Sequence, residues 1–136
     1  MKLDLIAFRP EEPRQPRVDI SASARPSDGD RFEVLVRIEV ESGTHLYADP
    51  APEGFEPLSV EVSTPDGAAF GEPSYPEPKA WADGAAVYDD VVDIVIPIAW
   101  SRGEGRQSLE IQVRYQACTD QACFLPKLER LFVDLP

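Results

Sequence analysis

The chain has 136 residues, which is enough for one domain that buries roughly two-thirds of the surface its unfolded form exposes. Its formal net charge of −12, from 25 acidic and 13 basic residues, argues against nucleic acid or an anionic membrane as a partner, because binding phosphate requires Lys and Arg. Apolar runs fall far short of the ~20 residues that cross a bilayer, and residues 1–7 lack the features of a signal peptide, so the sequence fits either a cytosolic protein or a domain cut from a longer exported chain.

The first 16 residues predict a linker or the tail of a preceding domain. A short apolar patch is followed by prolines at positions 10, 13 and 16, separated by mostly charged residues. Each proline fixes φ and lacks a backbone donor, which favours an extended connection. The apolar patch belongs either to a preceding domain or to a docking strand. We expect the domain itself to cover residues 17–136.

From residue 17 onward the dominant hydrophobic period is two, which is typical of half-buried strands. Strands of this kind are expected at about 18–22, 32–40, 58–62, 109–117 and 131–135. Residues 87–100 are apolar almost throughout, which predicts one central strand covered on both faces. Within that strand Pro97 requires an edge position or a bulge, because it has no N–H to donate.

No segment carries a helical stripe of useful length. Seven or eight short strands, with 14 prolines in the chain, predict an antiparallel immunoglobulin-like β-sandwich, with a small β-barrel as the alternative. Two stretches without strand patterns, about 43–57 and 65–86, are longer than the usual connection of ~4–6 residues and are candidates for functional loops.

The two cysteines of the chain, Cys118 and Cys123, are the main candidate functional residues. On one extended strand they would lie ~16 Å apart, whereas a disulfide needs Cα atoms within ~7 Å, so the chain must turn between them. Residues 119–122 predict a four-residue hairpin loop that places the cysteines opposite each other on antiparallel strands. A disulfide fits that geometry.

Several chemistries are open to this pair. A bridge that closes so small a loop stabilises the fold by only about 2 kcal/mol, which favours a reactive disulfide, although an inert hairpin disulfide remains an alternative. A zinc site is disfavoured, because zinc takes four ligands and the chain has one histidine, His45. The thioredoxin motif is absent, since four residues separate the cysteines instead of two. A Cys/His hydrolase would need His45 as its base, and a sandwich offers no helix N-terminus to activate the thiol.

Aromatic residues in the two long loops are candidates for covering the cysteines. His45 and Tyr47 are two residues apart, so they share a face in an extended chain. Each either packs over the cysteine pair or is an ordinary loop side chain. Trp81 lies in a polar, proline-rich stretch and is either a lid over the sulfurs or a packing residue. If Asp120, Glu77 and Asp83 lie close by, their charges disfavour the thiolate.

The segment YQAC at residues 115–118, followed by Cys123 and Pro126, resembles the N-terminal periplasmic domain of the thiol:disulfide interchange protein DsbD. The segments GTHLYA at 43–48 and YP, then VY, at 75–88 match the pattern of that family in the same order. The resemblance covers residues 17–136. The cysteine spacing is one residue shorter than in the best-known member, and the acidic-aromatic cap sequence of the family is not reproduced.

The resemblance implies an immunoglobulin-like domain in which Cys118 and Cys123 are a redox pair. Such a domain relays electrons to or from thioredoxin-fold proteins or domains through transient mixed disulfides, with Cys123 bonded to the partner. It needs no cofactor and no metal, and contacts a membrane only through other parts of a longer chain. The implied location is periplasmic or otherwise exported. Whether the domain counts as an enzyme is left open.

By the same analogy, residues 79–84 form a cap loop that shields the sulfurs. Trp81 and Asp83 are its expected shielding residues, and His45 and Tyr47 occupy positions beside the cysteines. The competing prediction is a sandwich that binds a partner through its long loops while the disulfide is inert. The redox potential of the bridge separates these two readings.

Overall fold

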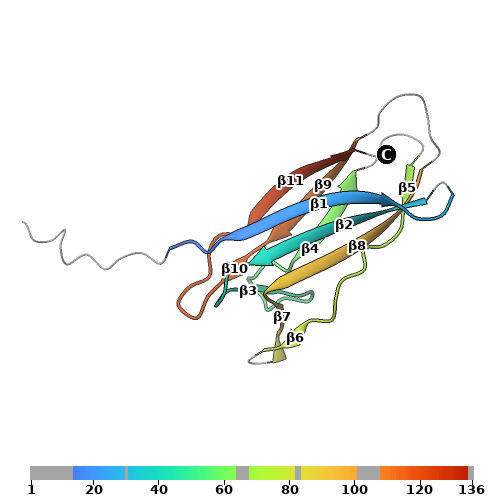
Figure 1. Ribbon diagram of the computed structural model, residues 1–136. Coiled ribbons are helices and arrows are strands. Elements are labelled where there is room, and N and C mark those ends of the chain that lie inside the picture. Colours follow the sequence, from blue (N-terminus) through green and yellow to red (C-terminus); the bar gives the residue numbers. More distant parts are fainter. Residues whose placement is uncertain (1–13, 30, 64–67, 82–83, 101–107, 135–136) are drawn as a thin grey trace, which may run out of the picture.

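The computed structural model describes residues 14–29, 31–63, 68–81, 84–100 and 108–134 (Figure 1). Every named element in this part of the chain is a strand, and none of the described residues belongs to a helix that could span a membrane. The strands are β1 (Val18–Pro26), β2 (Arg31–Val40), β3 (His45–Tyr47), β4 (Ser59–Ser63), β5 (Ala68–Phe70), β6 (Lys79–Ala80), β7 (Ala86–Tyr88), β8 (Val91–Trp100), β9 (Ser108–Tyr115), β10 (Ala117–Cys118) and β11 (Lys127–Asp134).

The strands form three antiparallel sheets, with the orders β1-β2-β8-β5, β11-β9-β4 and β10-β3-β7-β6. The first two sheets pack face to face as an immunoglobulin-like sandwich. The third is a small sheet of strands two or three residues long, at one end of the sandwich (Figure 1). It is this third sheet, called here the end sheet, that carries Cys118.

The core of the sandwich is built by the alternation that the sequence predicts. Every second residue of β2, β8 and β9 points inward, and burying these Val, Ile and Leu side chains is the main force that joins the sheets. The most completely buried of them are Val34, Val36, Ile38, Ile94, Ile96, Leu109, Ile111 and Val113. The predicted sandwich is therefore confirmed, and the alternative of a β-barrel is wrong.

The prediction of one continuous strand over residues 87–100 is wrong. The chain breaks into β7 and β8 at Asp90, whose φ of 63° is a left-handed conformation that Asp tolerates better than most residues. Val40 N donates to the Asp90 carbonyl at 2.7 Å, which fixes the break against β2. The turn sends β7 into the end sheet and β8 into the sandwich. Strand β8 is covered mainly on one face, since Val91 is 48% exposed.

Pro97 is not on an edge strand, one of the two positions that the sequence predicts, because β8 runs between β2 and β5, but the pairing with β5 ends at Ile98, one residue short of Pro97. It lies just beyond the end of β5, where its carbonyl accepts a hydrogen bond from Gly71 N at 2.9 Å. On the other side the pairing of β8 with β2 continues through Glu33↔Pro97 without a bulge. A Cβ at residue 71 would lie 2.8 Å from Pro97 Cγ, so the close approach of the two chains requires glycine there.

The two stretches expected to be loops are loops only in part. Residues 43–57 contain β3, and residues 65–86 contain β5, β6 and the first residue of β7. These strands are two or three residues long, too short to show a hydrophobic period. Residues 1–13 of the predicted linker lie outside the described part of the chain. The boundary near residue 17 stays a prediction.

Candidate functional site

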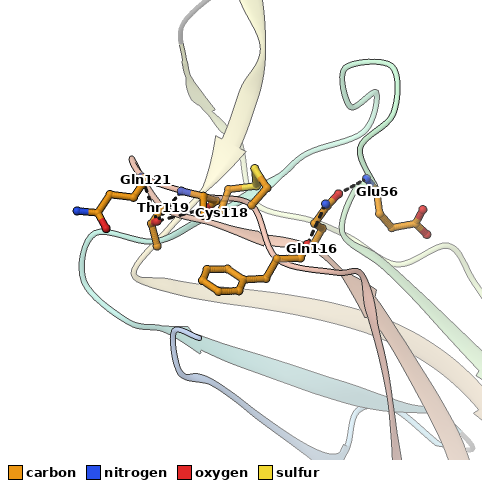
Figure 2. Close-up of a disulfide and its surroundings, with 8 residues drawn as sticks. Glu56, Gln116, Cys118, Thr119 and Gln121 are labelled. Atoms are coloured by element: carbon orange, nitrogen blue, oxygen red, sulfur yellow. Dashed lines mark hydrogen bonds between the residues drawn. A yellow bond between two sulfur atoms is a disulfide. The ribbon is translucent and has the colours of Figure 1, made fainter. Parts of the chain in front are cut away.

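The two cysteines form a disulfide across a hairpin that follows β10 (Figure 2). Cys118 and Cys123 pair as an antiparallel bridge, with their Cα atoms 4.0 Å apart. Thr119 holds the turn: its N donates to the Ala122 carbonyl at 2.8 Å, and its Oγ1 accepts from Gln121 N and Ala122 N at 3.2 Å each. The predicted hairpin and its disulfide are thus present.

The two halves of the disulfide differ in exposure. Cys118 lies in the end sheet and is only 1% exposed, whereas Cys123 lies beyond the turn and is exposed. Leu125, two residues further on, is 84% exposed and adds apolar surface beside Cys123. A nucleophile that arrives from solvent therefore meets Cys123 first.

Gln116 ties the hairpin to the loop before β4. Its side chain is 8% exposed, accepts a hydrogen bond from Glu56 N at 2.8 Å and donates one to the Phe124 carbonyl at 2.9 Å (Figure 2). Phe124 N in turn donates to the Ala117 carbonyl at 2.9 Å. The sequence does not reveal this role. Residues 115–118 are all buried, so alternation carries no signal for a structural amide among them.

Three of the four residues predicted to cover the pair lie together. His45 pairs directly with Cys118 across β3 and β10 and is 7% exposed. Its ring centroid is 5.5 Å from that of Tyr47, in an edge-to-face arrangement, and 4.5 Å from that of Trp81. Trp81 itself is 48% exposed, so it forms the outer layer. Asp83, the fourth residue, lies outside the described part of the chain.

The segment that carries Trp81 is anchored to the end sheet. Strand β6 pairs with β7, and Trp81 N donates to the Ala85 carbonyl at 2.8 Å. Further back, the Tyr88 hydroxyl donates to the Pro76 carbonyl at 3.0 Å. Pro76 and Tyr88, which belong to the pattern shared with the family, thus position the segment that carries Trp81 and do not contact the sulfurs through this hydrogen bond.

A cavity of about 550 Å³ opens beside His45 and Trp81, and its charged lining is acidic except for Lys79. Burial lowers the pKa of His45, while the negative charge of Asp89 partly opposes that shift. Lys79 Nζ lies 2.7 Å from Asp89 Oδ1 and neutralises that carboxylate. The charged residues that line the cavity are Glu41, Lys79, Asp89, Asp90 and Asp120. The sequence suggested three acids near the cysteines. Asp120 lines this cavity, Glu77 is exposed in the segment before β6, and Asp83 lies outside the described residues.

Chemically, the arrangement offers a disulfide that a thiolate from outside can attack at one sulfur. No group of three or more His, Cys, Asp or Glu residues in the described part of the chain is placed to hold a metal ion. Both thiols are oxidised in the bridge, and disulfide sulfurs are not thiolate ligands.

The chain is an immunoglobulin-like sandwich domain that carries a disulfide in a hairpin, with one cysteine exposed and the other buried. The chain belongs to the family described as "Thiol:disulfide interchange protein DsbD, N-terminal", whose family model matches residues 12–135. Membership of this family and the bonded cysteine pair both fit thiol–disulfide interchange. A comparison with curated protein sequences gives no significant match.

Solved structures share the fold at low sequence identity. The DsbD N-terminal domain of Neisseria meningitidis, in complex with the PilB N-terminal domain, is 19% identical with a TM-score of 0.61, over 85% of this chain and 80% of that one. The reduced form of the same domain is 20% identical with a TM-score of 0.51, over 76% and 77%. The GAE domain of GGA2p from Saccharomyces cerevisiae is 9% identical with a TM-score of 0.55, over 92% and 95%. These likenesses establish the fold alone.

Proposed function

We propose that this domain exchanges its Cys118–Cys123 disulfide with thioredoxin-fold proteins and so relays electrons between them. The observation that carries the proposal is the asymmetry of the bridge: Cys123 is exposed, whereas Cys118 is 1% exposed. A structural disulfide does not need one accessible half. Family membership and the complex formed by the related Neisseria domain with PilB support the same reading.

In the reductive direction a partner thiolate attacks Cys123 Sγ. The Cys118–Cys123 bond breaks, the electron pair stays on the Cys118 sulfur, and that sulfur takes up a proton. A second thiol of the partner then attacks the partner's own sulfur in the mixed disulfide and releases Cys123. The partner has lost two electrons and the domain has gained them.

The cover limits which thiols gain access. His45 lies beside Cys118, the Trp81 ring lies against His45 at an interplanar angle of 38°, and the Tyr47 ring meets it edge to face. We infer that these rings cover the Cys118 side of the bridge and slow its exchange with small thiols relative to exchange with a docked protein partner. Asp83 is assigned to the same cover by analogy alone.

The domain is further proposed to work outside the cytoplasm as a module of a longer protein. The family to which it belongs is named for one domain of an interchange protein. Disulfides that form and persist are typical of exported compartments. Membrane contact and further redox domains belong to other parts of such a protein.

Equilibration with redox buffers tests the function directly. We expect the bridge to equilibrate with glutathione or thioredoxin, with a potential between about −270 and −120 mV, the range of known exchange proteins. A potential well below about −300 mV is typical of structural disulfides and would establish the alternative, a binding module with an inert bridge.

Trapping tests the assignment of Cys123. The Cys118→Ser variant leaves the exposed thiol free, and we expect it to capture a thioredoxin-fold protein as a stable mixed disulfide, read on a non-reducing gel. Cys123→Ser is the matched control, because its remaining thiol is buried, and capture should be at least tenfold slower. Equal capture by both variants contradicts the assignment.

A further inference from the structure

Four residues of the site form a row across the end sheet. Cys118 pairs with Cys123 on one side and with His45 on the other. Leu46 pairs with Tyr88, so the same antiparallel register places Asp89 next to His45. Directly paired residues point to the same face, with Cβ atoms ~4.5–5.5 Å apart. The order along the row is therefore Asp89, His45, Cys118 and Cys123.

The imidazole in this row has an unused hydrogen-bonding atom. His45 is 7% exposed, and its Nε2 is buried without a hydrogen-bond partner among the described residues. Neighbouring rings cover it: the Trp81 ring centroid lies 4.5 Å away and the Tyr47 centroid 5.5 Å away. A buried polar atom left without a partner is costly and calls for an explanation.

The surroundings of the row are unfavourable for a thiolate at Cys118, which is 1% exposed. Asp89, just after the end of β7, lies on the far side of His45 from Cys118, and its Oδ1 is paired with Lys79 Nζ of β6 at 2.7 Å. The other charged residues that line the adjoining cavity are Glu41, Asp90 and Asp120, all acidic. Burial and negative neighbours both disfavour a thiolate. Since Cys118 has to become a thiolate to re-form the disulfide, the reduced domain needs a proton acceptor beside it.

We propose that His45 accepts the proton of the Cys118 thiol when the reduced domain passes its electrons on. This step rests on the exchange function proposed above. Starting from a mixed disulfide between Cys123 and a partner, the thiol proton moves to the imidazole and the Cys118 thiolate attacks Cys123 Sγ. The Cys123–partner bond breaks, the partner sulfur leaves as a thiolate, and it or solvent takes the proton from His45. In the opposite direction the imidazolium protonates Cys118 as it leaves.

The protonation state of His45 in the folded domain suits this task. Burial lowers its pKa from the ordinary value, with Asp89 in partial opposition. A neutral imidazole at neutral pH is an acceptor, whereas an imidazolium would not be.

NMR titration of the wild-type protein tests the coupling of His45 and Cys118 without a partner protein. His45 is the only histidine of the chain, so its ring resonances can be followed directly. In the reduced protein we expect the ring resonances to show a second inflection at the pKa of the Cys118 thiol, since the two groups share a proton site. The oxidised protein and the Cys118→Ala variant should show a single inflection. Identical titration of His45 in all three forms overturns the proposal.

Kinetics supply the second arm. When the reduced domain reacts with oxidised glutathione, Cys123 forms a mixed disulfide that Cys118 then resolves. We expect His45→Phe to slow resolution at neutral pH by at least tenfold. As the pH rises toward the pKa of the Cys118 thiol, the rate of resolution in this variant should return toward the wild-type rate. Phe132→Leu, which alters a side chain that is 69% exposed on β11 and away from the end sheet, should resolve at the wild-type rate.

The two arms separate failure of this inference from failure of the proposed function. Loss of fold in His45→Phe would be visible in circular dichroism, and the wild-type titration would then decide alone. Resolution by a folded His45→Phe at the wild-type rate and pH dependence overturns the role of His45, even if exchange with protein partners is established. If His45 and Cys118 titrate together but the domain exchanges with no thioredoxin-fold protein, the proton transfer between them is supported and the proposed exchange function is rejected.

Discussion

Gln116 is a single side chain that spans two segments, since it bonds both Glu56 N and the Phe124 carbonyl. Gln116→Ala leaves these two backbone groups without partners, and we expect the free energy of unfolding to fall by about 1–3 kcal/mol. Gln121→Ala is the matched control, because that side chain is exposed at the turn, and it should change the value by less than about 0.5 kcal/mol. Urea unfolding measures both, and equal effects would show that the amide does not hold the hairpin.

Tyr115 makes the domain lose stability as the pH rises into the alkaline range. Its side chain is 3% exposed and its hydroxyl donates to Glu129 Oε1 at 3.2 Å. Burial, and then the charge of Glu129, raise the pKa of Tyr115 to about 12. An unfolded tyrosine ionises near pH 10, so between about pH 10 and 12 the unfolded chain has lost a proton that the folded one retains. Stability contributed by Tyr115 is complete below that range and is lost as the pH rises through it.

Unfolding free energies measured from pH 9 to pH 12 test this linkage. We expect a steeper decline for the wild type than for Tyr115→Phe. A residual slope should remain in the variant, because burial also raises the pKa of Tyr75 and Tyr88. The same slope in both proteins contradicts the assignment.

At the scale of elements, the turn after β10 sets how readily the disulfide forms. Thr119 Oγ1 accepts two backbone hydrogen bonds within the turn and so holds the cysteines near each other. Thr119→Val keeps the shape and removes the oxygen, at a cost of about 1 kcal/mol. The thiols of the variant are then less well placed to close, and the potential should rise by about 20 mV, since 30 mV corresponds to about 1.4 kcal/mol.

Titration against glutathione measures that shift. Thr119→Ser retains the oxygen and should keep the wild-type potential. An unchanged potential in Thr119→Val would mean that the turn is held by other contacts.

The elements also show what periodicity can and cannot predict. Strands β2, β4 and β9 are predictable because each alternates over five or more residues against one core, although the strand expected over 109–117 ends at Tyr115 and Ala117 belongs to β10 in another sheet. Strands β3, β6 and β10 have two or three residues, which is less than two periods of alternation. The break at Asp90 was missed because apolar residues on both sides conceal a change of sheet.

At the scale of the whole molecule, charge dominates the response to salt. The net charge of −12 produces self-repulsion, and a rise in ionic strength from about 10 to 150 mM screens it. Exposed ion pairs such as Arg37–Asp93, at 2.8 Å, weaken at the same time, but each contributes little. We expect a net gain of about 1 kcal/mol, or roughly 4 °C in Tm. Sodium and choline chloride should act equally, and a fall in Tm with salt contradicts the prediction.

The candidate site was predictable where its contacts are local. Cys118 and Cys123 lie five residues apart, so chain geometry alone brings them together. His45 and Tyr47 were placed on one face by their spacing, and their rings do meet. The neighbours that come from strand register, above all Asp89 beside His45, were not predictable, because register depends on how distant segments pair.

The short span of the disulfide has a consequence for turnover. Every pairing within the sandwich, such as Val18↔Val40 and Val60↔Val113, joins strands without help from the bridge. Opening and closing a loop of five residues leaves those connections in place. If the domain exchanges its disulfide as proposed, it can pass between the oxidised and reduced states without approaching its unfolded ensemble, and any structural change is confined to one hairpin.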